Sequence, residues 1–453
     1  ATFGASDDLQ IYHDGSNSYV QDAGTGNLNI KSNGSFIDIQ SDSTRINNAA
    51  NSEIMATFVA NGAVTLNYDN SAKLATTASG VHLGAGSVNA TLSTESAGTS
   101  NLTLGVNAGN SIASGGNYNV VVGDEAGTAI TTGDNNTAVG YGALDANTTA
   151  GNNSAFGYTA LTANTTGHEN DSFGAYSLAA NTTGNDNCAF GTATLSANTT
   201  ASNNTAFGRA ALELNTTGAN NVAVGRSALD SNTTADNNTA VGYASLGANT
   251  TGRDNTALGF SAGATNTTGL ENTAIGMYAL RFNTTGQTNT AVGLQALHRN
   301  TTASNNTAVG RNAMEANTTG SENTAVGTLS LDANTTGTNN ASFGYDSLSA
   351  NTTGVSNTAL GDSALKANTT ASNNTAVGQS ALLVNTTGQS NVAVGKSALS
   401  GNTTASDCTA VGKDALATNT VGQSNTAVGQ SALALNLNGT RNTAVGRTAL
   451  QTN

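Results

Sequence analysis

The sequence predicts an all-β protein, a β-solenoid or β-roll of about twenty 17-residue coils, preceded by a region rich in β-hairpins. The main observation is a glycine that closes Ala-Val-Gly or a close variant and recurs from Gly123 to Gly446, 323 residues or nineteen steps of 17 apart. The 453 residues contain no Pro, as expected where every backbone N–H is needed in a ladder. Only 4% are aromatic, which predicts a thin core repeated many times.

The repeat divides the chain into two parts. Residues 101–453 form the array, which we expect to be a solenoid shaft, and an irregular first copy ends at Gly105. Residues 1–100 lack the repeat. We expect this first part to be a cap or attachment module, because an uncovered solenoid end recruits other chains.

Three stretches of the first part have the alternation and turn residues of hairpins. They are LQIYHDGSNSYVQD (9–22), GNLNIKSNGSFIDIQ (26–40) and ATFVANGAVTLNYDNSAKLATT (56–77). The first turns at HDGSN, and the other two are centred on Asn33-Gly34 and Asn61-Gly62. Each stretch is therefore predicted to form a pair of antiparallel strands.

One unit of the array reads N-T-A-V-G-x-x-A-L-x-x-N-T-T-G/A-x-x. Its two large apolar residues are expected to stack into two core stripes that face each other inside a flattened coil. The first members of these stripes are Val139, Leu144, Phe156, Leu161, Phe173 and Leu178. Because neighbouring strand residues alternate faces, Ala138 and Ala143 are expected to point outward. This outer alanine stripe predicts close packing by another chain.

The turns follow the same period. The glycine after Val is never replaced, which predicts a positive φ or no room for a Cβ. The first eight such turn glycines are Gly123, Gly140, Gly157, Gly174, Gly191, Gly208, Gly225 and Gly242. The recurrent Asn of Asn-Thr-Thr is expected to stack into a polar ladder.

The segment x-x-A-L-x-x-N leaves two structures open. Arg209 and Glu213, like Arg226 and Asp230, are spaced i, i+4, as in one helical turn. A second short strand is favoured, because seven residues are too few for a helix without tertiary support.

Charge and cysteine content exclude several classes of protein. Fourteen Lys and Arg against 28 Asp and Glu give a net charge of −14, which disfavours nucleic acid and anionic membranes as partners. No apolar run is long enough for membrane insertion, and no signal peptide is visible. Cys188 and Cys408 lie 220 residues apart, too far along a solenoid to bond to each other, and pairing between chains stays open.

Catalytic chemistry has little support in the sequence. His13, His82, His168 and His298 are scattered, without metal or triad spacing, and are expected at the surface. No cofactor motif is present, and no acidic cluster interrupts the array as a glycan-cleaving enzyme would need. A non-enzymatic protein without metal or cofactor is therefore predicted.

Asn-Thr-Thr is also an N-glycosylation acceptor sequence, and this supports an alternative function: a self-assembling extracellular filament, densely N-glycosylated on these turns. The sixteen candidate sites are Asn147, Asn164, Asn181, Asn198, Asn215, Asn232, Asn249, Asn266, Asn283, Asn300, Asn317, Asn334, Asn351, Asn368, Asn385 and Asn402. Further Asn-Asn-Thr/Ser copies occur at Asn135, Asn152, Asn203, Asn237, Asn305 and Asn373. The simpler interpretation, that Asn suits the turn and Thr the ladder, is favoured.

The stretches SDDLQIYHDGSNSYV, GTGNLNIKSNGS and MATFVANGAVTLNYDNSAKLATTASGV resemble modules of tail-fibre and related structural proteins of tailed phages of aquatic bacteria. The NTAVG units are also similar to the head repeats of trimeric autotransporter adhesins. These resemblances imply a homotrimeric, fibrous, host-facing appendage whose shaft has no catalytic site. The implied location is a virion tail fibre or an extracellular filament, and the implied partners are other copies, other virion or filament proteins and host surface glycans. Host attachment or spacing is the function that follows.

Overall fold

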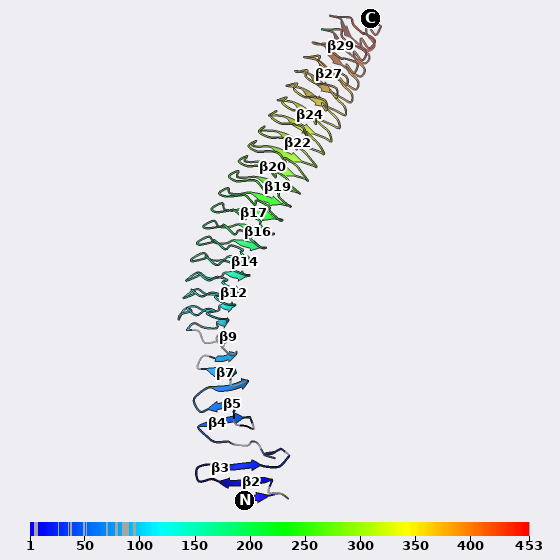
Figure 1. The fold of residues 1–453 in the computed structure, drawn as a ribbon. Helices are drawn as coiled ribbons and strands as arrows, with labels where there is room; N and C mark the ends of the chain where they lie inside the picture. Colours follow the sequence, from blue (N-terminus) through cyan, green and yellow to red (C-terminus); the bar gives the residue numbers. More distant parts are fainter. Residues whose placement is uncertain are drawn as a thin grey trace. The chain divides into compact units, whose positions relative to one another are not determined.

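The computed structural model describes residues 1–3, 8–25, 27–34, 36, 39–48, 50, 52–68, 71–77, 80–83, 90–93 and 97–452. The chain divides into two compact units, Ala1–Gly86 and Ser87–Asn453. The described residues form strands and turns, and none of them lies in a helix (Figure 1). Among them there is accordingly no helix that could span a bilayer.

The first unit is built of antiparallel neighbours. β1 pairs with β2 and β2 with β3, and β4 to β8 pair in chain order. The bounds are β1 (Thr2–Phe3), β2 (Leu9–His13), β3 (Ser18–Asp22), β4 (Ser43–Asn47), β5 (Ile54–Val59), β6 (Val64–Tyr68), β7 (Ser71–Thr77) and β8 (Gly80–Leu83). β2 and β3 confirm the hairpin predicted over 9–22. β5 and β6 confirm the pair centred on Asn61-Gly62, with Asn61 at φ 56°, and β7 adds a third strand that was not predicted within 56–77.

The hairpin predicted over 26–40 is wrong for the part that the structure describes. Residues 27–34, 36, 39 and 40 form no strand, while residues 26, 35, 37 and 38 lie outside the described part. The bend expected at Asn33-Gly34 is present, closed by Gly34 N donating to Ser32 Oγ at 3.1 Å, but the described residues on either side of it form no paired strands.

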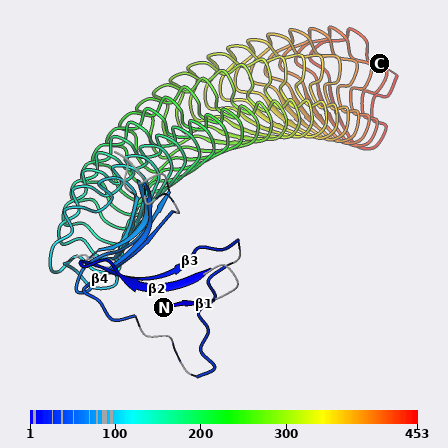
Figure 2. The ribbon, with the colours of Figure 1, turned by 60° about the horizontal axis from the view of Figure 1, so that its bottom comes forward.

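The second unit begins with β9 (Ala90–Ser93), which pairs antiparallel with β10. From β10 to β30 every strand pairs in parallel with the next, and Val139, Phe156 and Phe173 occupy equivalent places. The bounds are β10 (Leu102–Leu104), β11 (Val120–Val122), β12 (Thr137–Val139), β13 (Ser154–Phe156), β14 (Asp171–Phe173), β15 (Cys188–Phe190), β16 (Thr205–Phe207), β17 (Val222–Val224), β18 (Thr239–Val241), β19 (Thr256–Leu258), β20 (Thr273–Ile275), β21 (Thr290–Val292), β22 (Thr307–Val309), β23 (Thr324–Val326), β24 (Ala341–Phe343), β25 (Thr358–Leu360), β26 (Thr375–Val377), β27 (Val392–Val394), β28 (Thr409–Val411), β29 (Thr426–Val428) and β30 (Thr443–Val445). The predicted parallel β-solenoid is confirmed, and Figure 2 shows its coils stacked along a curved axis.

The segment after each closing glycine is neither of the two structures considered from the sequence. It consists of turns, with two left-handed residues per coil, such as Thr159 (φ 48°) and Leu161 (φ 54°). Their amides bond in opposite directions along the rod: Thr159 N donates to Tyr141 O at 2.8 Å, and Leu161 N to Ser177 O at 2.9 Å. The backbone N–H groups of this segment are therefore satisfied by the coils on both sides. Neither a helical turn nor a second strand is needed to satisfy them.

The predicted core is half right. Leu144, like Leu161 and Leu178, is fully buried, as expected. Ala138 and Ala143 are also fully buried, so the predicted outer alanine stripe is wrong. Val139, with Phe156 and Phe173, instead points outward and is half-buried. A three-residue strand turns only its middle residue inward, and the thin coil has room for one large stripe, which Leu fills.

The closing glycines are required for both reasons predicted from the sequence. Gly140 has φ 134°, and a Cβ built on it would lie 2.3 Å from Gly157 O in the next coil. The same close approach joins each of the eight predicted turn glycines to the glycine one coil later, with φ between 130° and 141°. The invariance of this residue is therefore a packing constraint between coils.

Candidate functional surfaces

Two columns of buried asparagine connect the coils from inside. In the column from the Asn-Thr-Thr sequences, Asn164 Nδ2 donates to Asn147 Oδ1 at 3.1 Å and to Gly167 O at 2.7 Å. In the column that precedes the strands, Asn170 Nδ2 donates to Asn153 Oδ1 at 3.2 Å and to Gly184 O at 2.9 Å. The polar ladder predicted from the sequence is present, and a second one runs beside the strands.

This burial contradicts the sixteen candidate glycosylation sites. Asn147 to Asn402 are at most 1% exposed, and their Nδ2 atoms, to which a glycan would attach, donate hydrogen bonds inside the coil. A glycan there would break the ladder and has no space in the folded chain. The six Asn-Asn-Thr/Ser residues differ, since Asn135, Asn152, Asn203, Asn237, Asn305 and Asn373 are exposed in left-handed turns.

The outer face of the strands carries an uninterrupted apolar column, here called the outer ridge. It consists of the third residue of each strand from β10 to β30: Leu104, Val122, Val139, Phe156, Phe173, Phe190, Phe207, Val224, Val241, Leu258, Ile275, Val292, Val309, Val326, Phe343, Leu360, Val377, Val394, Val411, Val428 and Val445. The rings of Phe156, Phe173, Phe190 and Phe207 stack at 4.4–4.8 Å between centroids. Many members are substantially exposed, for example Leu258 at 48%.

The two cysteines lie in different environments. Cys188 is the first residue of β15, on the outer face and half-buried, whereas Cys408 is buried in an asparagine column; both are free. Burial raises the pKa of both thiols. Neither is therefore an activated nucleophile, which would need a lowered pKa.

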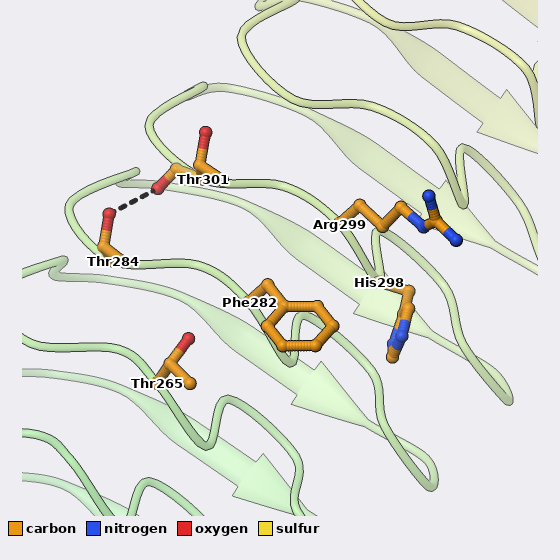
Figure 3. A pocket seen from close by; sticks show the side chains of 6 residues that line it. All are labelled: Thr265, Phe282, Thr284, His298, Arg299 and Thr301. Atoms are coloured by element: carbon orange, nitrogen blue, oxygen red, sulfur yellow. Dashed lines mark hydrogen bonds between the residues drawn. The ribbon is translucent and has the colours of Figure 1, made fainter.

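One local departure from the repeat forms a hollow, shown in Figure 3. The residue before the Asn of Asn-Thr-Thr is usually Ala, but three successive coils carry Thr265, Phe282 and Arg299 there. With His298, Thr284 and Thr301, they line a hollow of about 570 Å³. The sequence patterns described above did not predict this hollow. The replacement of Ala at one fixed position in three successive repeats is the signal that could have predicted it.

His298 corrects the expectation that all four histidines lie at the surface. It is 8% exposed, its Nδ1 lies 3.1 Å from Tyr278 O, and its ring meets that of Phe282 edge-on at 5.0 Å. His13 and His168 are exposed, as expected, and the side chain of His82 lies outside the described part. His298 is buried because its ring packs against Tyr278 and Phe282 of the preceding coil. This contact between coils cannot be read from the linear sequence.

The described residues hold no group of three or more His, Cys, Asp or Glu that could bind a metal ion. The pKa of Asp332 is raised to about 6, chiefly by burial and further by the nearby Asp346 and Glu315. Its Oδ1 has no hydrogen-bond partner. A half-buried carboxyl with an unsatisfied oxygen and two acids nearby is a local stability cost.

A repetitive β-solenoid of this kind is typical of structural proteins. Comparisons with protein-family models, with curated proteins and with solved structures found no match.

Proposed function

We propose that this protein is a structural, non-enzymatic fibre protein, whose array forms the shaft of a phage tail fibre or an adhesin-like appendage that spaces or attaches a particle to a host surface. The observation that carries the proposal is the unbroken parallel pairing from β10 to β30. At about 4.8 Å per coil, some twenty coils form a rod roughly 95 Å long. The resemblance of the sequence to tail-fibre modules supports the virion location.

The interior of the coil suits a shaft. Each coil is joined to the next by backbone hydrogen bonds and by two buried asparagine side chains, such as Asn164 and Asn170. A force along the rod must break these bonds together, because they act in parallel at every coil. Repeat proteins of this type also change length by whole coils without changing their fold.

Self-association as a homotrimer remains part of the proposal, but through the outer ridge and not through the buried alanines. Parallel sheets are normally covered on both faces, and here one face lies open. A strip of twenty strands at about 4.8 Å, about 10 Å wide, offers roughly 1,000 Å² per chain, above the ~800 Å² per partner of a stable interface. We infer that the partner is a second copy of the chain, because its outer ridge has the same spacing between coils along the whole strip.

Deletion of whole coils tests the shaft. Removing residues 272–322, three complete units, should shorten the rod by roughly 14 Å in electron micrographs and leave its circular dichroism unchanged. Removing residues 272–313, which breaks the period, should disrupt the fold at the junction. A shaft role is refuted if antibodies to the array label neither virions nor surface filaments.

Association is tested separately by native mass spectrometry against the 44.7 kDa chain. Lysine at Val292, Val309 and Val326 should dissociate the assembly, whereas lysine at the exposed Thr285, Thr302 and Thr319, on a turn of the same coils, should not. A wild-type monomer at every concentration refutes the interface but not the shaft. The same intact mass excludes dense glycosylation if it equals that of the bare chain.

A further inference from the structure

The hollow around Phe282 concentrates side chains that are rare elsewhere in the array. Phe282 is 40% exposed, and Arg281 is stacked on the rings of Tyr278 and Phe282, with its Cζ 4.6 and 5.0 Å from their centroids. These contacts fix the aromatic wall of the hollow and place a cation directly behind it.

The positive charges here form no ion pair with the described residues. The ion pairs among the described residues join Arg253 to Asp254, Lys366 to Asp346 and Lys413 to Asp414, so neither Arg281 nor Arg299 takes part in one. Glu315, in the column of Arg281 and His298, accepts a hydrogen bond at its Oε2 from Asn312 at 2.7 Å and takes part in none of these ion pairs. In a chain of net charge −14, two unpaired arginines beside an exposed ring mark a site for an anion.

Two threonines at the next positions of the repeat, Thr284 and Thr301, form a row along another side of the hollow, and Thr265 lies in the column of Phe282. The hydroxyl hydrogens of all three are already used. Thr284 Oγ1 donates to Thr301 O at 3.0 Å (Figure 3). Thr301 Oγ1 donates to Thr318 O at 3.0 Å, and Thr265 Oγ1 to Arg281 O at 2.8 Å. Because each hydroxyl donates inward, its remaining lone pairs are free to accept. The row therefore presents hydrogen-bond acceptors to a ligand rich in hydroxyl groups.

We propose that this hollow binds an acidic sugar residue, carboxylated or sulfated, of a glycan. The apolar face of the sugar ring packs on Phe282, its hydroxyls donate to the threonine row, and its anionic group pairs with Arg299 through charge-assisted hydrogen bonds. A volume of about 570 Å³ suits one or two sugar rings. This inference goes beyond the shaft role, because a rod without the hollow would still act as a spacer.

A second hollow in the array shows what the proposed site adds. It is lined by Ser349, Ala350, Lys366, Ala367, Leu383 and Val384 and has a similar volume of about 480 Å³. Its cation is already paired, since Lys366 Nζ lies 2.5 Å from Asp346 Oδ2, and no aromatic ring lines it. We expect this hollow to bind no acidic sugar.

Titration calorimetry of the full chain tests the site with three probes: trigalacturonate, a sulfated galactose trisaccharide and neutral maltotriose. One or both acidic probes should bind, more weakly as salt rises, and maltotriose should not. Phe282→Ala and Arg299→Ala should each weaken binding by about tenfold or more. Arg299→Lys should weaken it less, because lysine keeps the positive charge but lacks the paired N–H donors of the guanidinium.

The chain supplies its own controls for this test. Both alanine variants introduce the residue that most other coils carry at this place, so their rods should keep the wild-type length and melting temperature. Leu214→Ala changes the same position in a coil outside the hollow and should leave affinity unchanged. Absence of acidic-probe binding, equal binding of maltotriose, or variants that bind like wild type would each overturn the proposal.

Discussion

Val121 lies against Gly127: a Cβ built on that glycine would come within 3.2 Å of Val121 Cγ1 and 2.8 Å of Ile130 Cδ1. Most later coils contain the reverse combination, with Ala in the strand and Leu at the left-handed position, as in Ala291 and Leu297. The thin core is therefore filled from either side, and a large residue on one side requires a small one on the other.

The first prediction tests this exchange. Ala291→Val should cost about 1–3 kcal/mol, because it adds two methyl groups to a filled core. Thr290→Val, one residue away but outward, should be neutral, since Val222 and Val392 occupy the same place in other coils. Thermal melting followed by circular dichroism, with hydrogen exchange to localise the effect, measures both.

A second substitution in the same coil separates overpacking from other causes. Leu297→Gly should partly rescue Ala291→Val, with a coupling of about 1 kcal/mol or more in a double-mutant cycle, because glycine also relieves the strain at φ 50°. If Thr290→Val were damaging and Ala291→Val harmless, the alanines would not face the core.

The closing glycine supplies the second prediction. Gly293 has φ 134°, and a Cβ there would lie 2.5 Å from Gly310 O, so Gly293→Ala should cost about 3 kcal/mol or more from strain and collision. Gly247→Ala is the matched control, with its nearest contact at 3.3 Å, and should change stability by less than about 0.5 kcal/mol. Local exchange rates near β21 and β22 should rise in the first variant alone.

The third prediction concerns the break in the asparagine column at Cys408. Its amide still donates to Asn391 Oδ1 at 3.0 Å, and its Sγ lies 3.3 Å from Gly422 O, the contact that an asparagine Nδ2 makes in other coils. Cys408→Asn should replace the weak sulfur contacts with the amide hydrogen bonds of the column and stabilise the chain by about 1 kcal/mol. Cys408→Ser, too short to span the column, should give no gain, and equal melting temperatures of the two variants would contradict the explanation.

The fourth prediction follows from the raised pKa of Asp332. Its folded-state pKa of about 6 exceeds the ordinary 3.8, so the folded chain holds a proton that the unfolded chain has released between these pH values. The contribution of Asp332 to stability is therefore highest below pH 3.8, falls as pH rises through this window, and is lowest above pH 6.

Asp332→Asn should accordingly stabilise the protein at pH 7 by roughly 1–2 kcal/mol, after allowance for solvent screening, and have little effect at pH 4. Unfolding curves of both proteins at the two pH values measure the difference. A gain of the same size at pH 4 would assign the effect to something other than the charge.

Much of the architecture was predictable because it depends on periodicity alone. A strict step of 17 residues, without Pro and with a glycine that never changes, predicts parallel coils in register and a close approach at Gly140. Stacked asparagines were predictable for the same reason, since identical residues one coil apart must meet. The hairpin over 9–22 was also predictable, because its turn residues specify it locally.

The direction in which each residue faces was decided by the tertiary structure. Alternation along Thr137-Ala138-Val139 separates two faces but does not say which is inside, and residue size suggested the wrong one. The space left beside Leu144 is taken by the small Ala138, and the larger Val139 turns out to solvent. The hollow at Phe282 likewise exists only because stacking brings residues 17 positions apart into contact. By itself the sequence determined the period of this protein, and packing across a thin coil determined what that period buries and what it exposes.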